Sequence, residues 1–161
     1  MLVILLVGLS ACRPRETELP IKTIGRYPFG QNGGLYMDRE PTLVAITQAF
    51  EVAMLDDWIF EDPQEQLLKL DYDAYFAIVV FQGLKPGSGF GVQIDKVTRN
   101  ENVVTAFAQF AEPAPGMETT AAEESPYHVV RVNKAGSWSQ DITINLVVDE
   151  VVIATTTNYI P

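Results

Sequence analysis

The carboxyl-terminal half of the chain is a succession of short runs of β-branched and aromatic residues, and this feature constrains the fold more than any other. The first run, Tyr75–Phe81 (YFAIVVF), is continuously apolar, which is typical of a strand buried on both faces. Further runs of this kind follow at 90–98, 103–110, 127–132, 142–148 and 151–157. The sequence therefore predicts a sheet of about six to seven mainly antiparallel strands.

Two local patterns refine this sheet. The run 90–98 alternates apolar and polar residues but slips phase once near Lys96, which predicts a β-bulge. The last two runs are separated only by Asp149 and Glu150, as in a two-residue hairpin. Such turns favour glycine or asparagine, because their residues have positive φ angles, so a longer connection is the alternative at this position.

The segment after Pro41 has two interpretations. Residues 42–46 (TLVAI) are continuously apolar, and Thr47 can cap a helix over 48–55, which gives a strand followed by a helix. The alternative is one long helix starting at Pro41, with a stripe formed by Leu43, Ile46, Phe50 and Met54. With the strand-first interpretation, the expected fold is α+β and mostly β, with one helix packed on a face of the sheet.

Charge and rare residues exclude several classes of function. The 161 residues carry a net charge of -10, so a nucleic acid would be repelled, and we expect no nucleic-acid partner. One cysteine and one histidine exclude a disulfide framework and a zinc site built from such ligands. We expect no metal and no cofactor.

The amino terminus has the features of a targeting segment. Residues 1–11 (MLVILLVGLSA) form an apolar run of the length of a signal peptide, too short to span a bilayer as a helix. Leu9-Ser10-Ala11-Cys12 resembles the lipobox of bacterial lipoproteins, which implies cleavage between Ala11 and Cys12 and lipidation of Cys12. No Lys or Arg precedes the apolar run, which leaves the position of the true start open. We expect an extracytoplasmic protein of the cell envelope, attached to the membrane by its lipid.

The rest of the chain is expected to divide simply. Residues 12–28 are polar and contain prolines, so we expect the lipidated cysteine to be followed by a flexible tether. Residues 29–161 are long enough to bury a core without disulfides or metals, and we expect them to form a single globular domain.

The stretch from about 71 to 161 resembles the C-terminal domain of the protease complex subunit PrcB family. Its first motif is a strand that ends in glycine and Lys-Pro, at 76–86 (FAIVVFQGLKP). A glycine-rich turn then leads into an aromatic residue and a strand at 87–94 (GSGFGVQI). Glu112-Pro-Ala-Pro-Gly116 and Ser125-Pro-Tyr127 later enclose an acidic loop. The family usually has an aromatic residue, often tyrosine, where Phe90 stands.

The resemblance implies a non-catalytic accessory subunit that binds a secreted or surface protease. It supplies no catalytic residues, so binding positions follow only from their place on the two loops. The expected partner-binding residues are Lys85, Gly87, Gly89, Phe90, Glu112, Glu118, Glu123, Glu124 and Tyr127. For the glycines and Phe90, the alternative is a purely structural role in turns and core. An alternative function is a protease inhibitor-like module that acts through these end loops.

The acidic loop supports a binding role. No Lys or Arg occurs between Arg99 and Arg131, so this part of the surface should carry a negative field that attracts a basic partner. Long loops without secondary structure are usually functional or mobile. Trp58, Phe60 and Trp138 are candidate binding residues if exposed, although aromatic side chains of this kind belong more often to the core.

An envelope enzyme is the third alternative and the one with least support. His128 is the only imidazole, and no nucleophile-elbow motif surrounds any serine. By strand periodicity His128 shares a face with Val130 and Val132, which favours a structural histidine. Adjacent acids such as Glu123 and Glu124 leave a weak calcium site as an alternative to a solvated acidic surface.

Overall fold

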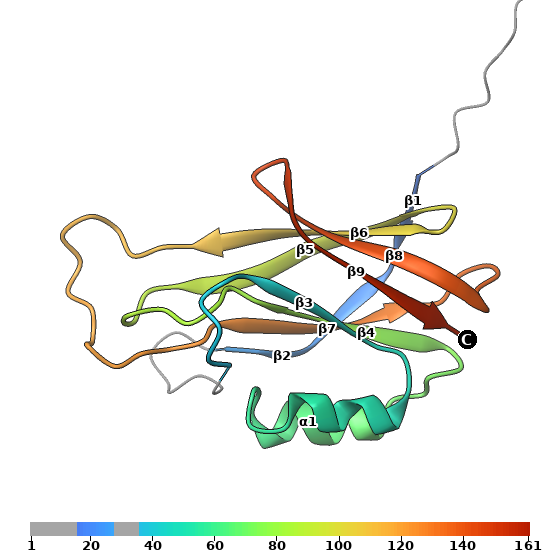
Figure 1. Ribbon diagram of the computed structural model, residues 1–161, viewed down its shortest axis with the longest axis horizontal. Helices are drawn as coiled ribbons and strands as arrows, with labels where there is room; N and C mark the ends of the chain where they lie inside the picture. Colours follow the sequence, from blue (N-terminus) through green and yellow to red (C-terminus); the bar gives the residue numbers. More distant parts are fainter. Residues whose placement is uncertain (1–15, 28–35) are drawn as a thin grey trace, which may run out of the picture.

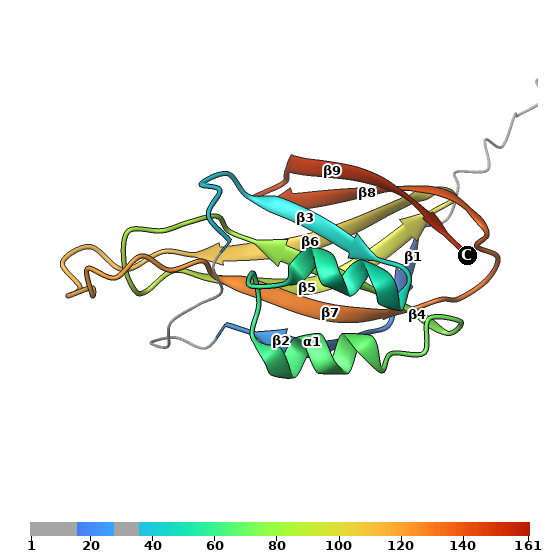
Figure 2. The ribbon, with the colours of Figure 1, turned by 60° about the horizontal axis from the view of Figure 1, so that its bottom comes forward.

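The computed structural model describes residues 16–27 and 36–161, which form a sandwich of two sheets with two short helices on one side (Figures 1 and 2). The strands are β1 (Thr17–Leu19), β2 (Ile21–Arg26), β3 (Thr42–Ile46), β4 (Tyr75–Phe81), β5 (Gly91–Asn100), β6 (Val103–Ala111), β7 (Tyr127–Asn133), β8 (Gln140–Val148) and β9 (Val151–Ile160). The helices are the 3-10 helix η1 (Ala49–Leu55) and the α-helix α1 (Glu61–Leu68). The mostly-β α+β class is therefore confirmed.

The strands divide between two sheets. The five-strand sheet has the order β1-β5-β6-β8-β9, and every pairing in it is antiparallel except β6 with β8. The four-strand sheet has the order β2-β7-β4-β3 and is antiparallel throughout. Consecutive strands β4 and β5 thus belong to different sheets, which sequence periodicity alone does not reveal.

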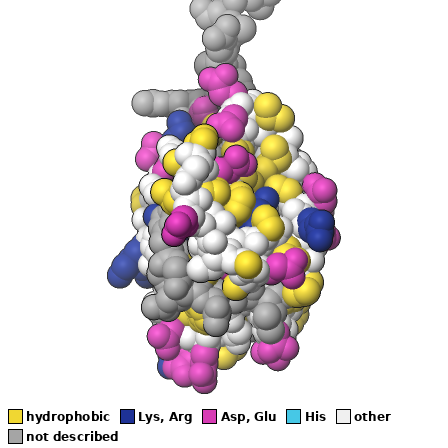
Figure 3. Space-filling model, turned by 90° about the vertical axis from the view of Figure 1, so that its left-hand side faces the viewer, with side chains coloured by type: hydrophobic (Ala, Val, Ile, Leu, Met, Phe, Trp, Pro, Cys, Tyr) yellow, Lys and Arg dark blue, Asp and Glu magenta, His cyan; other side chains and the backbone are white. Residues whose placement is uncertain are grey.

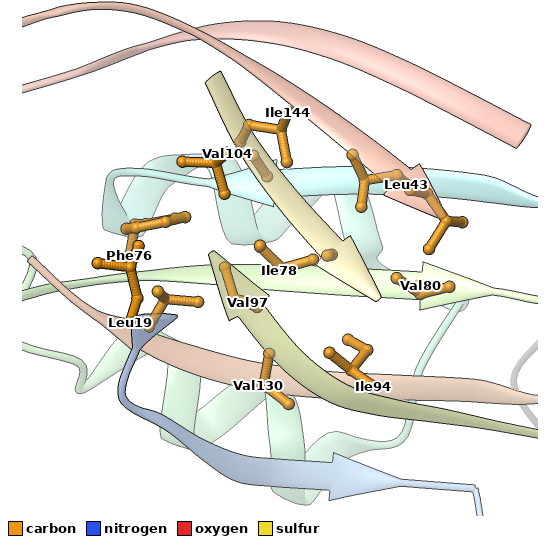
Figure 4. Packing of buried hydrophobic residues seen from close by; sticks show 14 of the residues in the cluster. Leu19, Leu43, Phe76, Ile78, Val80, Ile94, Val97, Val104, Val130 and Ile144 are labelled. Atoms are coloured by element: carbon orange, nitrogen blue, oxygen red, sulfur yellow. The ribbon is translucent and has the colours of Figure 1, made fainter. Parts of the chain in front are cut away.

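The uninterrupted apolar run of β4 is explained by two separate cores. Its side chains alternate between the faces of the four-strand sheet. Phe76, Ile78 and Val80 point into the core between the sheets, while Ala77, Val79 and Phe81 point toward the helices. Figure 4 shows the core between the sheets, to which β1, β3, β5, β6, β7 and β8 also contribute. Helices on one side and a second sheet on the other leave β4 without a solvent-facing side.

Two local predictions in the five-strand sheet are confirmed. The register of β5 against β6 shifts between Ile94 and Lys96, so the bulge lies where the alternation slips phase. The β8–β9 hairpin closes through Asp149 and Glu150, whose φ angles are 50° and 66°. The connection is thus the short one, although neither residue is glycine or asparagine.

The segment after Pro41 is a strand followed by a helix. β3 has the predicted bounds Thr42–Ile46 and pairs along its whole length with β4, which overturns the alternative of one long helix. The helix that follows, η1, is of 3-10 type and is capped by Gln48 and Glu51 rather than by Thr47. The Thr47 amide instead donates a hydrogen bond to the Glu51 carboxylate.

The second helix, α1, has no counterpart in the prediction. Its first turn is Glu61-Asp62-Pro63, which suits a helix start because acids interact favourably with the helix dipole and proline needs no hydrogen-bond partner there. Pro63 and Leu67 are buried against the four-strand sheet. The acids Glu61 and Asp62 thus begin a helix that the sequence patterns did not predict.

Residues expected in the tether are partly strands. β1 pairs with β5 and β2 pairs with β7, so residues 17–26 extend both sheets. Leu19 is 2% exposed in the core between the sheets, and this apolar contact stabilises the short strand β1. Ala11 and Cys12, the expected cleavage and lipidation residues, lie outside the described residues. Among the described residues, no helix has the length and apolar character needed to cross a membrane.

Candidate functional site

Two loops meet at one end of the sandwich. The first connects β4 to β5 and contains the glycine-rich turn; the second, 112–126, connects β6 to β7. β4 pairs with β7 and β5 pairs with β6, so both loops leave the sheets at the same end, on the left of Figure 1. We name this surface the loop end, and it contains eight of the nine residues expected to bind a partner; the ninth, Tyr127, is the first residue of β7.

Backbone hydrogen bonds join the two loops. The Lys85 amide donates to the Glu124 carbonyl at 2.7 Å, and the Glu124 amide donates back to the Lys85 carbonyl at 3.0 Å. Farther out, the Thr120 amide donates to the Ser88 hydroxyl at 2.9 Å. Hydrogen bonds therefore hold the second loop against the first at two positions, one near the sheets and one farther out.

The glycines are needed for this close approach. A Cβ atom on Gly87 would collide with the Thr120 carbonyl oxygen. Gly89 has a φ angle of 96°, and a Cβ there would lie 2.8 Å from the Cβ of Pro113. The structural role considered for both glycines therefore accounts for their position, because each lets the second loop pack against the first.

The side chains of the loop end differ in exposure. Glu112, Glu118 and Glu123 are exposed. Lys85 and Phe90 are partly buried and contact each other, with the Lys85 ammonium 5.7 Å from the centre of the Phe90 ring. These five side chains are accessible to a partner to differing degrees, and the three acids are the most accessible.

Glu124 and Tyr127 are buried, at 5% and 1% exposure, so the structure does not present their side chains to a partner. The ring of Tyr127 packs in the core beneath the helices, with its centroid 6.0 Å from that of Phe81. Its hydroxyl accepts a hydrogen bond from the Phe60 amide at 3.1 Å, and burial raises the pKa of this phenol. Tyr127 thus joins β7 to the start of α1.

Sequence analysis missed a group of buried polar residues under the loops. Gln82 is 1% exposed and donates from Nε2 to the Ala111 carbonyl at 3.1 Å, which ties the end of β4 to the end of β6. Ser125 is fully buried beside Glu124. The sequence contained one indication of this group. Gln82 directly follows β4 and continues the alternate positions Phe76, Ile78 and Val80, which face the core between the sheets.

The outer part of the second loop is an acidic tip. Met117 is 58% exposed and lies beside Glu118, and Glu112 and Glu123 lie at the two ends of the exposed stretch. Figure 3, which faces this end of the molecule, shows hydrophobic and acidic side chains exposed together. The loop end therefore combines apolar contact area with a negative field.

His128 has the environment of a structural residue. It is 3% exposed, and its Nδ1 accepts a hydrogen bond from the Ile94 amide at 2.8 Å, while Nε2 lies 2.8 Å from the Thr23 hydroxyl. Burial, assisted by the positive charge of Arg26, lowers the pKa of His128 to about 4. With both nitrogens engaged, the imidazole links β7 to β5 and β2 and is not placed to act on a substrate.

The large aromatic residues belong mainly to the cores. Trp138 is 9% exposed between the sheets, and Trp58 packs against the core beneath the helices. Phe60 is 37% exposed at the start of α1, and its ring centroid lies 6.3 Å from that of Tyr127, the residue that follows the second loop. Within residues 16–27 and 36–161, no three His, Cys, Asp or Glu side chains come together in a way that could hold a metal ion.

Comparison with known proteins identifies the central part of this structure. Residues 76–133 match the family model described as PrcB C-terminal. The matched segment runs from the start of β4 to the end of β7, so it includes both loops of the loop end. No curated protein and no solved structure matches the chain.

Proposed function

Because residues 76–133 are a PrcB C-terminal domain, we propose that the chain is a non-catalytic protein-binding module, an accessory subunit of a secreted or surface protease complex. The protease as partner is what the resemblance to the protease complex subunit PrcB family implies. The observation that carries the proposal is the loop end. Hydrogen bonds hold its two loops together, and both loops lie within the matched segment.

The loop end is suited to protein binding in two ways. Its base is fixed by the Lys85–Glu124 bridge and by Gln82, so little loop ordering is needed when a partner binds. Its acidic tip bears Glu118 and Glu123 in a stretch without any Lys or Arg, which favours association with a basic surface. Binding through this surface requires no catalytic residue in the chain.

The position of the first strand, opposite the loop end, suits a subunit that is attached to the membrane by its amino terminus. We propose that Cys12 carries the lipid and that the protein resides in the cell envelope, outside the cytoplasm. β1 begins at Thr17, which pairs with Arg99 near the end of β5 that lies farthest from the loop end. Figure 1 shows β1 and the loop end on opposite sides of the molecule. A lipid near β1 would therefore leave the loop end directed away from the membrane.

The proposal is tested by cross-linked capture from the native organism, with the full chain as bait and mass spectrometry of the captured proteins. The informative variant is Glu118→Lys with Glu123→Lys, which reverses two charges at the acidic tip. Its matched control is Glu101→Lys with Asp141→Lys, which reverses two exposed charges elsewhere, one in the turn between β5 and β6 and one on β8. Both variants change the net charge equally, so a difference between them reports the location of the contact.

We expect a secreted or surface protease at near-stoichiometric yield with the wild type and the control, and about tenfold less with the tip variant. Equal capture by the two variants would move the contact away from the loop end. Capture of no protease would overturn the proposal. If a protease is captured, its turnover separates the two kinds of binding. Unchanged or faster turnover indicates a subunit, whereas slower turnover at stoichiometric amounts indicates an inhibitor.

A further inference from the structure

A second candidate site lies on the side of the four-strand sheet that carries the helices, away from the loop end. It is a cleft of about 380 Å³ between β2, β7, the start of β4 and the carboxyl-terminal end of α1. Its charged lining residues are Lys22, Lys69, Asp71 and Arg131. A cleft with more basic than acidic side chains stands out in a chain whose net charge is -10.

Two of these cations lie directly opposite each other. Lys22 on β2 is the register partner of Arg131 on β7, so both side chains project from the same face of the sheet. Like charges in directly opposite positions repel and destabilise a strand pair. An anion between them would remove this repulsion.

The carboxylates of the described residues form no ion pair with Lys22 or Arg131. Among the described residues, the only ion pair is that of Lys69 with Glu65, at 2.8 Å. The Asp71 carboxylate accepts a hydrogen bond from the Asp73 amide at 3.1 Å and so stabilises the turn that precedes β4. Lys22 and Arg131 therefore remain without a carboxylate partner in the described part of the chain.

The geometry of Arg131 suits an oxyanion. Its guanidinium lies over the ring of Tyr75, 4.4 Å from the ring centre, which orients the planar group. It donates no hydrogen bond to any described residue, so its donors are available to a ligand. A planar guanidinium can donate two parallel hydrogen bonds to a carboxylate or a phosphate.

One part of the cleft lining is apolar. Ile24, Leu70 and the ring of Tyr75 line it together with the two cations. The Gln66 amide donates to the Ile24 carbonyl at 3.3 Å and joins α1 to β2 on one side of the cleft. The lining thus offers an apolar contact beside a pair of positive charges, which suits a small anionic ligand with a hydrocarbon part.

We propose that this cleft binds an anionic ligand through a carboxylate or phosphate group held between Arg131 and Lys22, with the apolar part of the ligand against Ile24, Leu70 and Tyr75. The ligand class follows from the paired cations and the oriented guanidinium. The site is independent of the loop end, so it can exist whether or not the chain binds a protease.

The test is an NMR titration of the full chain with benzoate, phenyl phosphate, acetate and inorganic phosphate, with sodium chloride at matched ionic strength as the blank. We expect saturable shifts of the Lys22 and Arg131 signals. Benzoate should bind more tightly than acetate, and phenyl phosphate more tightly than phosphate, because of the apolar lining. Whichever of benzoate and phenyl phosphate binds with the higher affinity identifies the preferred oxyanion, carboxylate or phosphate.

Three variants locate the site. Lys22→Gln and Arg131→Gln should each weaken binding of the better probe about tenfold or more, the effect of losing a charged hydrogen bond. The control is Lys96→Gln, which removes an exposed lysine on the other sheet and should leave binding unchanged. Absence of saturable shifts beyond those of chloride, or equal weakening by the control variant, would overturn the proposal. Lys22 is exposed, so its variant keeps the test valid even if replacement of Arg131 disturbs the fold.

Discussion

Replacement of His128 by glutamine should make the folded state of this protein less sensitive to acid. In the folded state His128 Nδ1 accepts a hydrogen bond from the Ile94 amide. The proton of the neutral ring is therefore on Nε2, next to the Thr23 hydroxyl. A second proton would have to sit on Nδ1, where it would face the Ile94 N–H group. The buried site therefore excludes the charged form for two reasons, desolvation and the loss of this hydrogen bond.

The size of the effect follows from the pKa of His128, which burial lowers from 6.5 to about 4. Because the folded protein binds this proton less readily than the unfolded chain does, acid favours unfolding. The contribution to stability is fully present above pH 6.5 and is lost as the pH falls toward 4. The difference between the two pKa values corresponds to about 3 kcal/mol in the free energy of unfolding.

The assay is urea unfolding at pH 7, 5.5 and 4, followed by the fluorescence of Trp58 and Trp138. Carboxylate titrations affect wild type and variant alike, so they cancel in the comparison. The wild type should lose about 3 kcal/mol more than His128→Gln between pH 7 and pH 4. Equal losses in the two proteins would refute the reasoning. His128 is the only histidine, so its NMR titration gives the pKa directly.

Two further substitutions test the packing of the loops and of the helix. Gly87→Ala should cost about 1–3 kcal/mol and speed proteolysis of the loop 112–126, because its Cβ collides with the Thr120 carbonyl. The control is Gly116→Ala, whose added Cβ meets nothing within 4 Å. It should cost about 1 kcal/mol, because the backbone there is left-handed, and should leave the rate of loop cleavage at the wild-type value. Equal cleavage rates in the Gly87 and Gly116 variants would contradict the argument. Tyr127→Phe should lower the free energy of unfolding by about 1 kcal/mol, because the Phe60 amide loses its acceptor; a urea midpoint equal to that of the wild type would contradict this.

The strands that sequence analysis located are those whose pattern is local. Tyr75–Phe81 was found with its bounds unchanged because both of its faces are buried, so the whole run is apolar. The bulge beside Lys96 was found because one extra residue reverses the alternation. The division of the strands between two sheets was not predicted, since it depends on which strands pair and not on the composition of any strand.

The missed elements depend on contacts with distant parts of the chain. β2 (IKTIGR) is an edge strand with few apolar residues, and its place is set by pairing with β7. α1 contains only two apolar residues besides Pro63, and its buried Leu67 contacts a core formed by other elements. Local propensity is weak in both segments, and tertiary contacts determine their structure.

The loop end was predictable as a place, though not in its details. The glycines and prolines marked both loops, and the order of the motifs suggested that the loops belong together. The burial of Glu124 was not predictable, because it depends on the bridge to Lys85, a residue far away in the sequence. The start of a strand at Tyr127 was predicted, but the burial of its side chain was not, because this depends on contacts with Phe81 and with the start of α1. The charged cleft was missed because Lys22 and Arg131 lie far apart in the sequence and become neighbours only through the β2–β7 register.

The fold also shows why the matched segment needs the rest of the chain. Residues 76–133 supply β4 and β7, the two central strands of the four-strand sheet, and β5 and β6 of the other sheet. Alone, these strands would expose both the face that β8 covers through Ile142, Ile144 and Leu146 and the face that the helices cover. The amino-terminal strands, the helices and the β8–β9 hairpin bury these faces. The loops at one end of the segment are thereby supported on rigid sheets, a condition for a binding surface that loses little entropy when its partner arrives.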